Sequence, residues 1–157
     1  MTAQLAGLSD DPAEDFRRIV AALTRRTGDP DYAVTLTADV FRTAWAEDRT
    51  GTTVGYCSLL SLALRAAAAA VRDADAAAAR QPSDAGAIAS LRVRDREVLR
   101  MVYWDELSMA ELAEFLGCSM AQAGIRLDRA YRRAERRLQR RENRRAQTSR
   151  RRNGVPL

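Results

Sequence analysis

Histidine and lysine are absent from this 157-residue chain, so all 26 of its basic side chains are arginine. Without histidine there can be no Ser-His-Asp triad, no Cys-His pair and no histidine-ligated zinc. Without lysine there can be neither a Schiff base nor a phosphate-loop lysine. The two cysteines, Cys57 and Cys118, have neither the spacing of a metal site nor a disulfide framework around them. We therefore expect no enzyme, no cofactor and no bound metal, and two cysteines that are buried or half-buried.

The chain also has few aromatic side chains and no long apolar run. Aromatics make up 6% of the residues, and the most apolar stretch, residues 54–71, contains Ser58, Ser61 and Arg65. This stretch is unlike a membrane span. The first ten residues lack the positive start and the apolar run of a secretory signal. We expect a cytoplasmic protein that does not bind membranes.

Charge is distributed unevenly along the sequence. Residues 126–157 carry 13 arginines and three acids, a net charge of +10, whereas residues 1–125 carry 13 arginines and 18 acids, a net charge of −5. Such asymmetry indicates a basic arm for a polyanion, joined to an acidic body that binds something else. We take residues 142–157 as an Arg-rich tail, for which a solvated, disordered chain weighs as much as a phosphate-binding arm.

Every periodic segment of the sequence predicts a helix, and none predicts a strand. The first helix should have Asp11 as its N-cap and Pro12 at its first position, and should end at Gly28. A second helix follows the break at residues 29–30. A third should run as one helix from about residue 54 through the alanine runs to residue 79. The expected fold class is all-α.

The clearest boundary in the sequence is residues 81–90, which begin with small and polar residues and a proline, as a linker between domains does. This linker divides the chain into two small helical domains, residues 11–80 and residues 91–141. Trp45 in the first domain and Trp104 in the second are expected to be core anchors.

The strongest signal in the second domain is a pair of capping boxes around a short turn. Ser108-Met109-Ala110-Glu111 opens one helix and Ser119-Met120-Ala121-Gln122 opens the next. Gly117 stands between them, where a left-handed C-cap belongs. A helix, a short turn with glycine and a second capped helix form a helix-turn-helix. The alternative interpretation is a helical hairpin with a charged outer face.

The second helix of this pair carries apolar residues on one side and arginines on the other. Its N-terminal end can enter a major groove of duplex DNA while arginines further along contact phosphates. The expected DNA-contacting residues are Ser119, Met120, Gln122, Ile125, Arg126, Arg129, Arg132 and Arg133. For Gln122, capping of the helix is the favoured alternative to a base contact.

Several short motifs between residues 91 and 138 carry a family resemblance: Arg96-Glu97-Val98-Leu99, Tyr103-Trp104, Glu111-Leu112-Ala113-Glu114, Leu116-Gly117-Cys118-Ser119 and Arg126-Leu127-Asp128-Arg129-Ala130. Together they resemble region 4 of extracytoplasmic-function sigma factors, a helix-turn-helix that recognises the −35 promoter element. The resemblance implies promoter DNA and RNA polymerase core as partners.

The N-terminal half resembles region 2 of the same family in outline, through Gly28-Asp29 and Asp39-Val40-Phe41-Arg42-Thr43-Ala44-Trp45. In the family, region 2 docks on the polymerase and opens the −10 element. The resemblance implies polymerase or partner contacts by Leu36, Asp39, Val40, Arg42 and Thr43.

Two hypotheses follow. In the first, the protein is a sigma factor of this type, or a sigma-like regulator, that binds promoter DNA with its C-terminal domain and polymerase with its N-terminal domain. In the second, the N-terminal domain is a protein-interaction module for an anti-sigma factor, a second copy or an activator, without promoter melting. The second is favoured by Val34, Thr35 and Ala38, which stand where the family has acidic residues and a glutamine.

Overall fold

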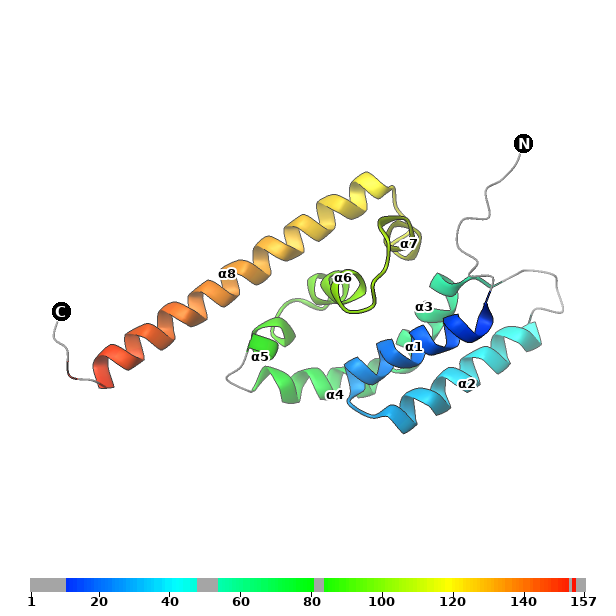
Figure 1. The fold of residues 1–157 in the computed structure, drawn as a ribbon, viewed down its shortest axis with the longest axis horizontal. Helices are drawn as coiled ribbons and strands as arrows, with labels where there is room; N and C mark the ends of the chain where they lie inside the picture. The colour runs from blue at the N-terminus through cyan, green and yellow to red at the C-terminus, as the bar shows by residue number, and fades with distance from the viewer. Residues whose placement is uncertain (1–10, 48–53, 81–83, 153, 155–157) are drawn as a thin grey trace.

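A computed structural model describes residues 11–47, 54–80, 84–152 and 154, and within these ranges it contains helices and no strand (Figure 1). The all-α class is therefore confirmed. The helices are α1 (Pro12–Thr27), α2 (Pro30–Glu47), α3 (Tyr56–Ala66), α4 (Ala68–Ala79), α5 (Asp84–Ala89), α6 (Val93–Tyr103), α7 (Met109–Phe115) and α8 (Met120–Arg152).

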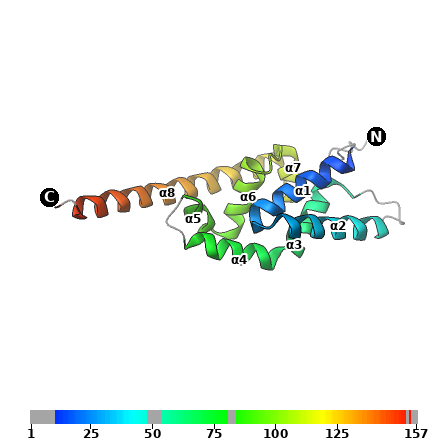
Figure 2. The same ribbon diagram turned by 60° about the horizontal axis from the view of Figure 1, so that its bottom comes forward.

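The helices form two groups with a rod along one side. Figures 1 and 2 show α1 to α4 together on one side of the molecule and α8 as a long rod on the other, with α5, α6 and α7 between them. Helices α1 and α2 pack against each other, α4 packs against α5, and α6 and α7 pack against α8.

The first helix begins and ends where the sequence predicts. The carboxylate of Asp11 accepts a hydrogen bond from the Ala13 N–H at 2.9 Å, and Pro12 occupies the first position. At the other end Gly28 adopts a left-handed conformation with φ 75°. Its N–H donates to the Thr24 carbonyl at 2.8 Å, which closes the helix.

The predicted third helix is in fact two helices. The chain leaves the regular helix at Ala67, which has ψ near −1° and is completely buried, and α4 begins at the next residue. The bend allows α3 to contact α2 and α7 while α4 contacts α1 and α5. Alanine favours a helix on both sides of the bend, so intrinsic propensity gives no signal for it.

Two other predicted boundaries differ from the structure. Residues 81–83 of the predicted linker lie outside the described residues, but residues 84–89 form α5, which packs on α4 and α8. Of the Arg-rich tail, residues 142–152 continue α8 as a helix to Arg152, so the helix ends beyond the boundary at residue 141. This segment contains no glycine or proline and is rich in strong helix formers. Residues 153 and 155–157 lie outside the described residues.

The two halves of the chain share one apolar core. It includes Ile19, Leu23 and Leu60 from the N-terminal half and Leu112 and Ala130 from the C-terminal half, all of which are completely buried. The helix-turn-helix is therefore held against the N-terminal helices by a continuous set of apolar contacts.

Buried ion pairs join the same two halves. Arg26 of α1 contacts Asp105 at 2.6 Å, and each side chain is only 1% exposed. Arg26 also contacts Glu97 of α6 at 3.0 Å. In a second group, Asp75 of α4 forms ion pairs with Arg96 at 2.6 Å and with Arg100 at 2.7 Å. Because an unpaired charge is costly in the interior, moving the two halves apart at these pairs would be unfavourable.

Candidate nucleic-acid interface

The turn between α7 and α8 has the geometry that the sequence predicts. Gly117 lies just after α7 with φ 60°, a conformation that glycine adopts without a steric penalty. The Gly117 N–H donates to the Glu114 carbonyl and the Cys118 N–H donates to the Ala113 carbonyl, each at 3.0 Å. This pair of bonds is a Schellman motif, which ends α7 and redirects the chain into α8.

Both predicted capping boxes are present. Ser108 Oγ accepts from the Glu111 N–H at 3.2 Å, and the Glu111 carboxylate accepts from the Ser108 N–H at 2.8 Å. At the start of α8, Ser119 Oγ accepts from the Gln122 N–H at 3.2 Å. Gln122 Oε1 accepts from the Ser119 N–H at 3.3 Å. The second helix of the helix-turn-helix therefore begins where the two serines predict.

Glu111 also ties α7 to the N-terminal half. Its carboxylate contacts Arg18 of α1 at 3.0 Å, and the Arg18 guanidinium stacks over the Tyr56 ring at 3.8 Å from the ring centre. Partial burial opposes ionisation of Glu111, but hydrogen bonds from Ser108 and Arg18 lower the pKa of this carboxyl. The charged form of Glu111 thus fixes the orientation of α7 on α1 and α3.

Small side chains hold α8 close to the rest of the domain. Ala123 and Ala130 are completely buried and Ala134 is 7% exposed, so α8 approaches its neighbours α6 and α7 closely. Near the start of α8, Met120 and Ile125 are 61% and 52% exposed. Large exposed apolar side chains at the start of a capped helix are available to a partner.

The predicted DNA-contacting residues divide into two groups. Met120, Ile125, Arg126 and Arg129 are exposed, and no hydrogen bond or ion pair to another described residue engages the side chains of the two arginines. Arg129 lies ten positions after Ser119, so this surface extends over about 15 Å of helix.

The remaining predicted residues are already engaged within the molecule. The side chains of Ser119 and Gln122 form the capping box, so capping is the role that the structure gives to Gln122. Arg132 contacts Asp128 at 3.0 Å. Arg133 donates to both oxygens of Asp95 on α6, at 2.8 and 2.9 Å, and so anchors α8 to α6.

The predicted polymerase-binding or partner-binding residues lie on α2, and not all of them are accessible. Asp39 and Arg42 are exposed and contact each other at 2.6 Å. Thr43 is also exposed, and its hydroxyl donates to the Asp39 carbonyl. Leu36 is half-buried against the core. Val40 is 8% exposed and belongs to the core, so its apolar side chain stabilises the helix pair and cannot contact a partner in this conformation.

The two tryptophans are not the core anchors that the sequence predicts. Trp45 is 62% exposed and makes an edge-to-face contact with Phe41, with ring centres 5.6 Å apart. Trp104 is 45% exposed and lines an apolar groove with Tyr103 and Leu138. Trp45 lies in the last turn of α2, and Trp104 is the C-cap of α6. The two cysteines are buried and half-buried, as predicted.

A helix-turn-helix with an open, basic first stretch of its second helix defines a DNA-binding class of domain. In agreement with this, residues 85–133 match the family Sigma-70, region 4, which covers almost all of α5, all of α6 and α7, and the first part of α8. The match shows a region 4 domain in these residues, and such a domain supports a sigma-factor-like, DNA-binding role in transcription. Such a domain implies interaction with DNA and with RNA polymerase in general.

The other comparisons add no relative, since no curated protein and no solved structure matches the chain significantly. In the described part of the chain, no helix has both the length and the apolar character needed to cross a membrane.

Proposed function

We propose that this chain is a sigma-like transcription regulator of the extracytoplasmic-function type. It reads promoter DNA with the N-terminal end of α8 and binds RNA polymerase core with α2. The observation that carries this proposal is the exposed surface of Met120, Ile125, Arg126 and Arg129 on a helix whose start is fixed by a capping box.

The chemistry of this surface suits a major groove. An exposed arginine such as Arg126 can donate two hydrogen bonds to guanine, and an apolar side chain such as Ile125 can contact the methyl group of thymine. Asp128 would repel phosphates, but its charge is compensated by Arg132. The free N–H groups and the dipole at the start of α8 attract a phosphate of the same duplex.

Support for the polymerase contact comes from the outer face of α2. Asp39, Arg42 and Thr43 are exposed there within slightly more than one turn. The ion pair between Asp39 and Arg42 is largely solvated, and such a pair can exchange partners at little cost.

The test is co-elution of the full chain with RNA polymerase core, together with run-off transcription from a promoter that the chain selects. Asp39→Arg should abolish co-elution and leave DNA binding intact. Asp31→Arg makes the same charge change on the same helix and should leave both intact. Co-elution that survives Asp39→Arg would remove α2 from the polymerase contact.

The second candidate function is a sigma-like protein whose N-terminal half binds a regulatory protein and does not melt promoters. Val34 and Trp45, on the outside of α2, are 47% and 62% exposed and offer apolar contacts to such a partner. A chain that binds duplex DNA but neither co-elutes with core enzyme nor supports run-off transcription would favour this candidate.

A further inference from the structure

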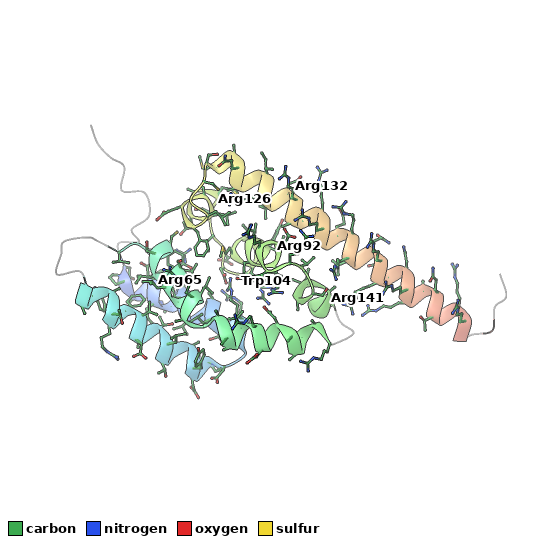
Figure 3. All side chains as sticks on the ribbon, turned by 180° about the vertical axis from the view of Figure 1, so that it is seen from behind. Arg65, Arg92, Trp104, Arg126, Arg132 and Arg141 are labelled. Atoms are coloured by element: carbon green, nitrogen blue, oxygen red, sulfur yellow. The ribbon has the colours of Figure 1, made fainter. Side chains whose placement is uncertain are left out.

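A second basic surface lies well beyond the N-terminal end of α8, where the middle of this helix passes α5 and the start of α6. We call it the arginine groove. It consists of two adjoining hollows of about 280 and 460 Å³, both lined by Arg137 and Arg140. Its principal arginines are Arg92, Arg136, Arg137, Arg140, Arg141 and Arg144. Figure 3 shows Arg141 on α8 beside α5, further along the helix than Arg126 and Arg132.

Among the described residues that line it, the arginine groove is rich in guanidinium groups and poor in carboxylates. The one carboxylate among the described residues that line it is Asp95, and both of its oxygens accept from Arg133. Arg137 is positioned by a hydrogen bond to Ser90 Oγ at 3.0 Å. Arg136 and Arg140 are exposed and contact no carboxylate within the described residues. The groove is therefore built to receive an anion.

The position of the groove separates it from the surface that enters the major groove. Arg140 lies 20 residues after Met120, which is about 30 Å along the helix axis. A straight helix can follow a curved groove about 12 Å wide for only a few turns before it leaves that groove and passes over the neighbouring phosphates. The arginine groove would therefore contact a different segment of a bound polyanion than Arg126 does.

Its residue types favour nucleic acid over protein. Arg136, Arg140 and Arg144 form an i, i+4, i+8 row with about 6 Å between neighbours, and the planar guanidinium matches phosphate oxygens. No aromatic side chain lines either hollow in the described part of the chain. Protein interfaces, in contrast, usually contain aromatic anchors.

We propose that the arginine groove binds the phosphate backbone of DNA that flanks the site read by the N-terminal end of α8. This inference rests on the proposed DNA-binding function and extends it with a second, sequence-independent contact. It predicts that affinity depends on the length of the duplex, because a short duplex occupies only the first surface.

The test compares the full chain with R136Q/R140Q/R144Q. A matched control, R17Q/R65Q/R72Q, removes the same charge from exposed positions on α1, α3 and α4. Fluorescence anisotropy measures affinity for duplexes of about 12 and about 40 base pairs with the same central site, between about 50 and 200 mM salt. Circular dichroism verifies that each variant is folded.

The unmodified chain should bind the longer duplex about 10- to 100-fold more tightly. The groove variant should lose this advantage, and the slope of log K against log salt should fall by about 2.7. Its preference for the central sequence should be unchanged, and the control variant should behave like the unmodified chain.

An unchanged salt slope and length dependence in the groove variant would overturn the proposal, and so would a lost preference for the central sequence. If that variant kept its salt slope but no longer bound polyglutamate, the groove would belong to an acidic protein, which also overturns it. Failure of the unmodified chain to bind any duplex would refute the DNA-binding function itself. That result is distinct from failure of the groove variant alone.

Discussion

Removal of the charge on Asp105 is the sharpest test of how the two halves are held together. The Asp105 side chain is 1% exposed and accepts hydrogen bonds from Arg26 at 2.6 Å and from Arg25 at 2.9 Å. Asp105→Asn keeps the shape of the side chain but leaves the buried guanidinium of Arg26 opposite a neutral amide. Loss of one member of a buried pair costs about 3–5 kcal/mol.

The expected cost lies at the lower end of this range, because Arg26 keeps two partners. Glu97 contacts it at 3.0 Å, and the Ala22 carbonyl accepts from it at 3.0 Å. We therefore expect Asp105→Asn to reduce the free energy of unfolding by about 3 kcal/mol. For a chain of this length, the melting temperature should fall by about 6–12 °C.

Urea denaturation followed by circular dichroism measures this change. The matched control is Asp39→Asn, which breaks an ion pair of the same length, 2.6 Å, whose side chains are 55% and 75% exposed. The control should cost less than about 1 kcal/mol. An Asp105→Asn variant as stable as the control would refute the argument that burial makes this pair important.

The remaining predictions concern the turn, pH and thiol reactivity. Gly117→Ala should destabilise the chain by about 1 kcal/mol in urea denaturation, because φ at this position is 60°. Gly124→Ala should instead stabilise it by up to about 1 kcal/mol, because alanine favours a helix more than glycine does and the added Cβ would have its nearest contact at 3.9 Å. A change in stability of the opposite sign for either variant would contradict the helix-turn-helix geometry. Because the folded-state pKa of Glu111 is lowered from 4.5, its contribution to stability is present above that value and is lost as pH falls through the folded pKa. Glu111→Gln should therefore be less stable than the unmodified chain at pH 7 and lose less stability on acidification. Profiles of unfolding free energy against pH that run parallel for the two proteins would argue against a stabilising role of the Glu111 charge. Burial raises the pKa of the Cys57 thiol to about 12, so iodoacetamide at about pH 8 should modify Cys118 first, and peptide mapping that finds Cys57 first would contradict its burial.

Local signals in the sequence predict the helix-turn-helix well. A capping box involves residues three positions apart, and the left-handed turn requires one glycine, so Ser108, Gly117 and Ser119 carry their own structural information. The structure confirms each of them. The exposed positions of Ile125 and Arg126 follow from helical periodicity once the start of α8 is known.

Features that depend on distant contacts could not be predicted in the same way. The bend at Ala67 accompanies the packing of α3 and α4 on different helices, and the helix propensity of alanine does not indicate it. Asp105 and Arg26 are 79 residues apart in the sequence, so no local pattern links them. The burial of Val40 and the exposure of Trp45 likewise depend on which residues of other helices pack around them.

Arg92 shows the same limit for the second basic surface. It begins α6 as the N-cap, 44 residues before Arg136, and lies beside that residue only because α6 packs along α8. Charge counting predicts a basic arm, but the groove requires α8 to continue as a helix beyond residue 141. The structure shows this continuation, which a count of charges does not indicate.

Selection from a random duplex library with the full chain, followed by binding measurements on the enriched sequence, tests most directly whether α8 reads DNA. We expect an enriched motif, and we expect Arg126→Ala to lose about 1–3 kcal/mol of affinity and the preference at one base pair. Absence of any enriched motif, or equal affinity and preference in Arg126→Ala, would contradict this expectation.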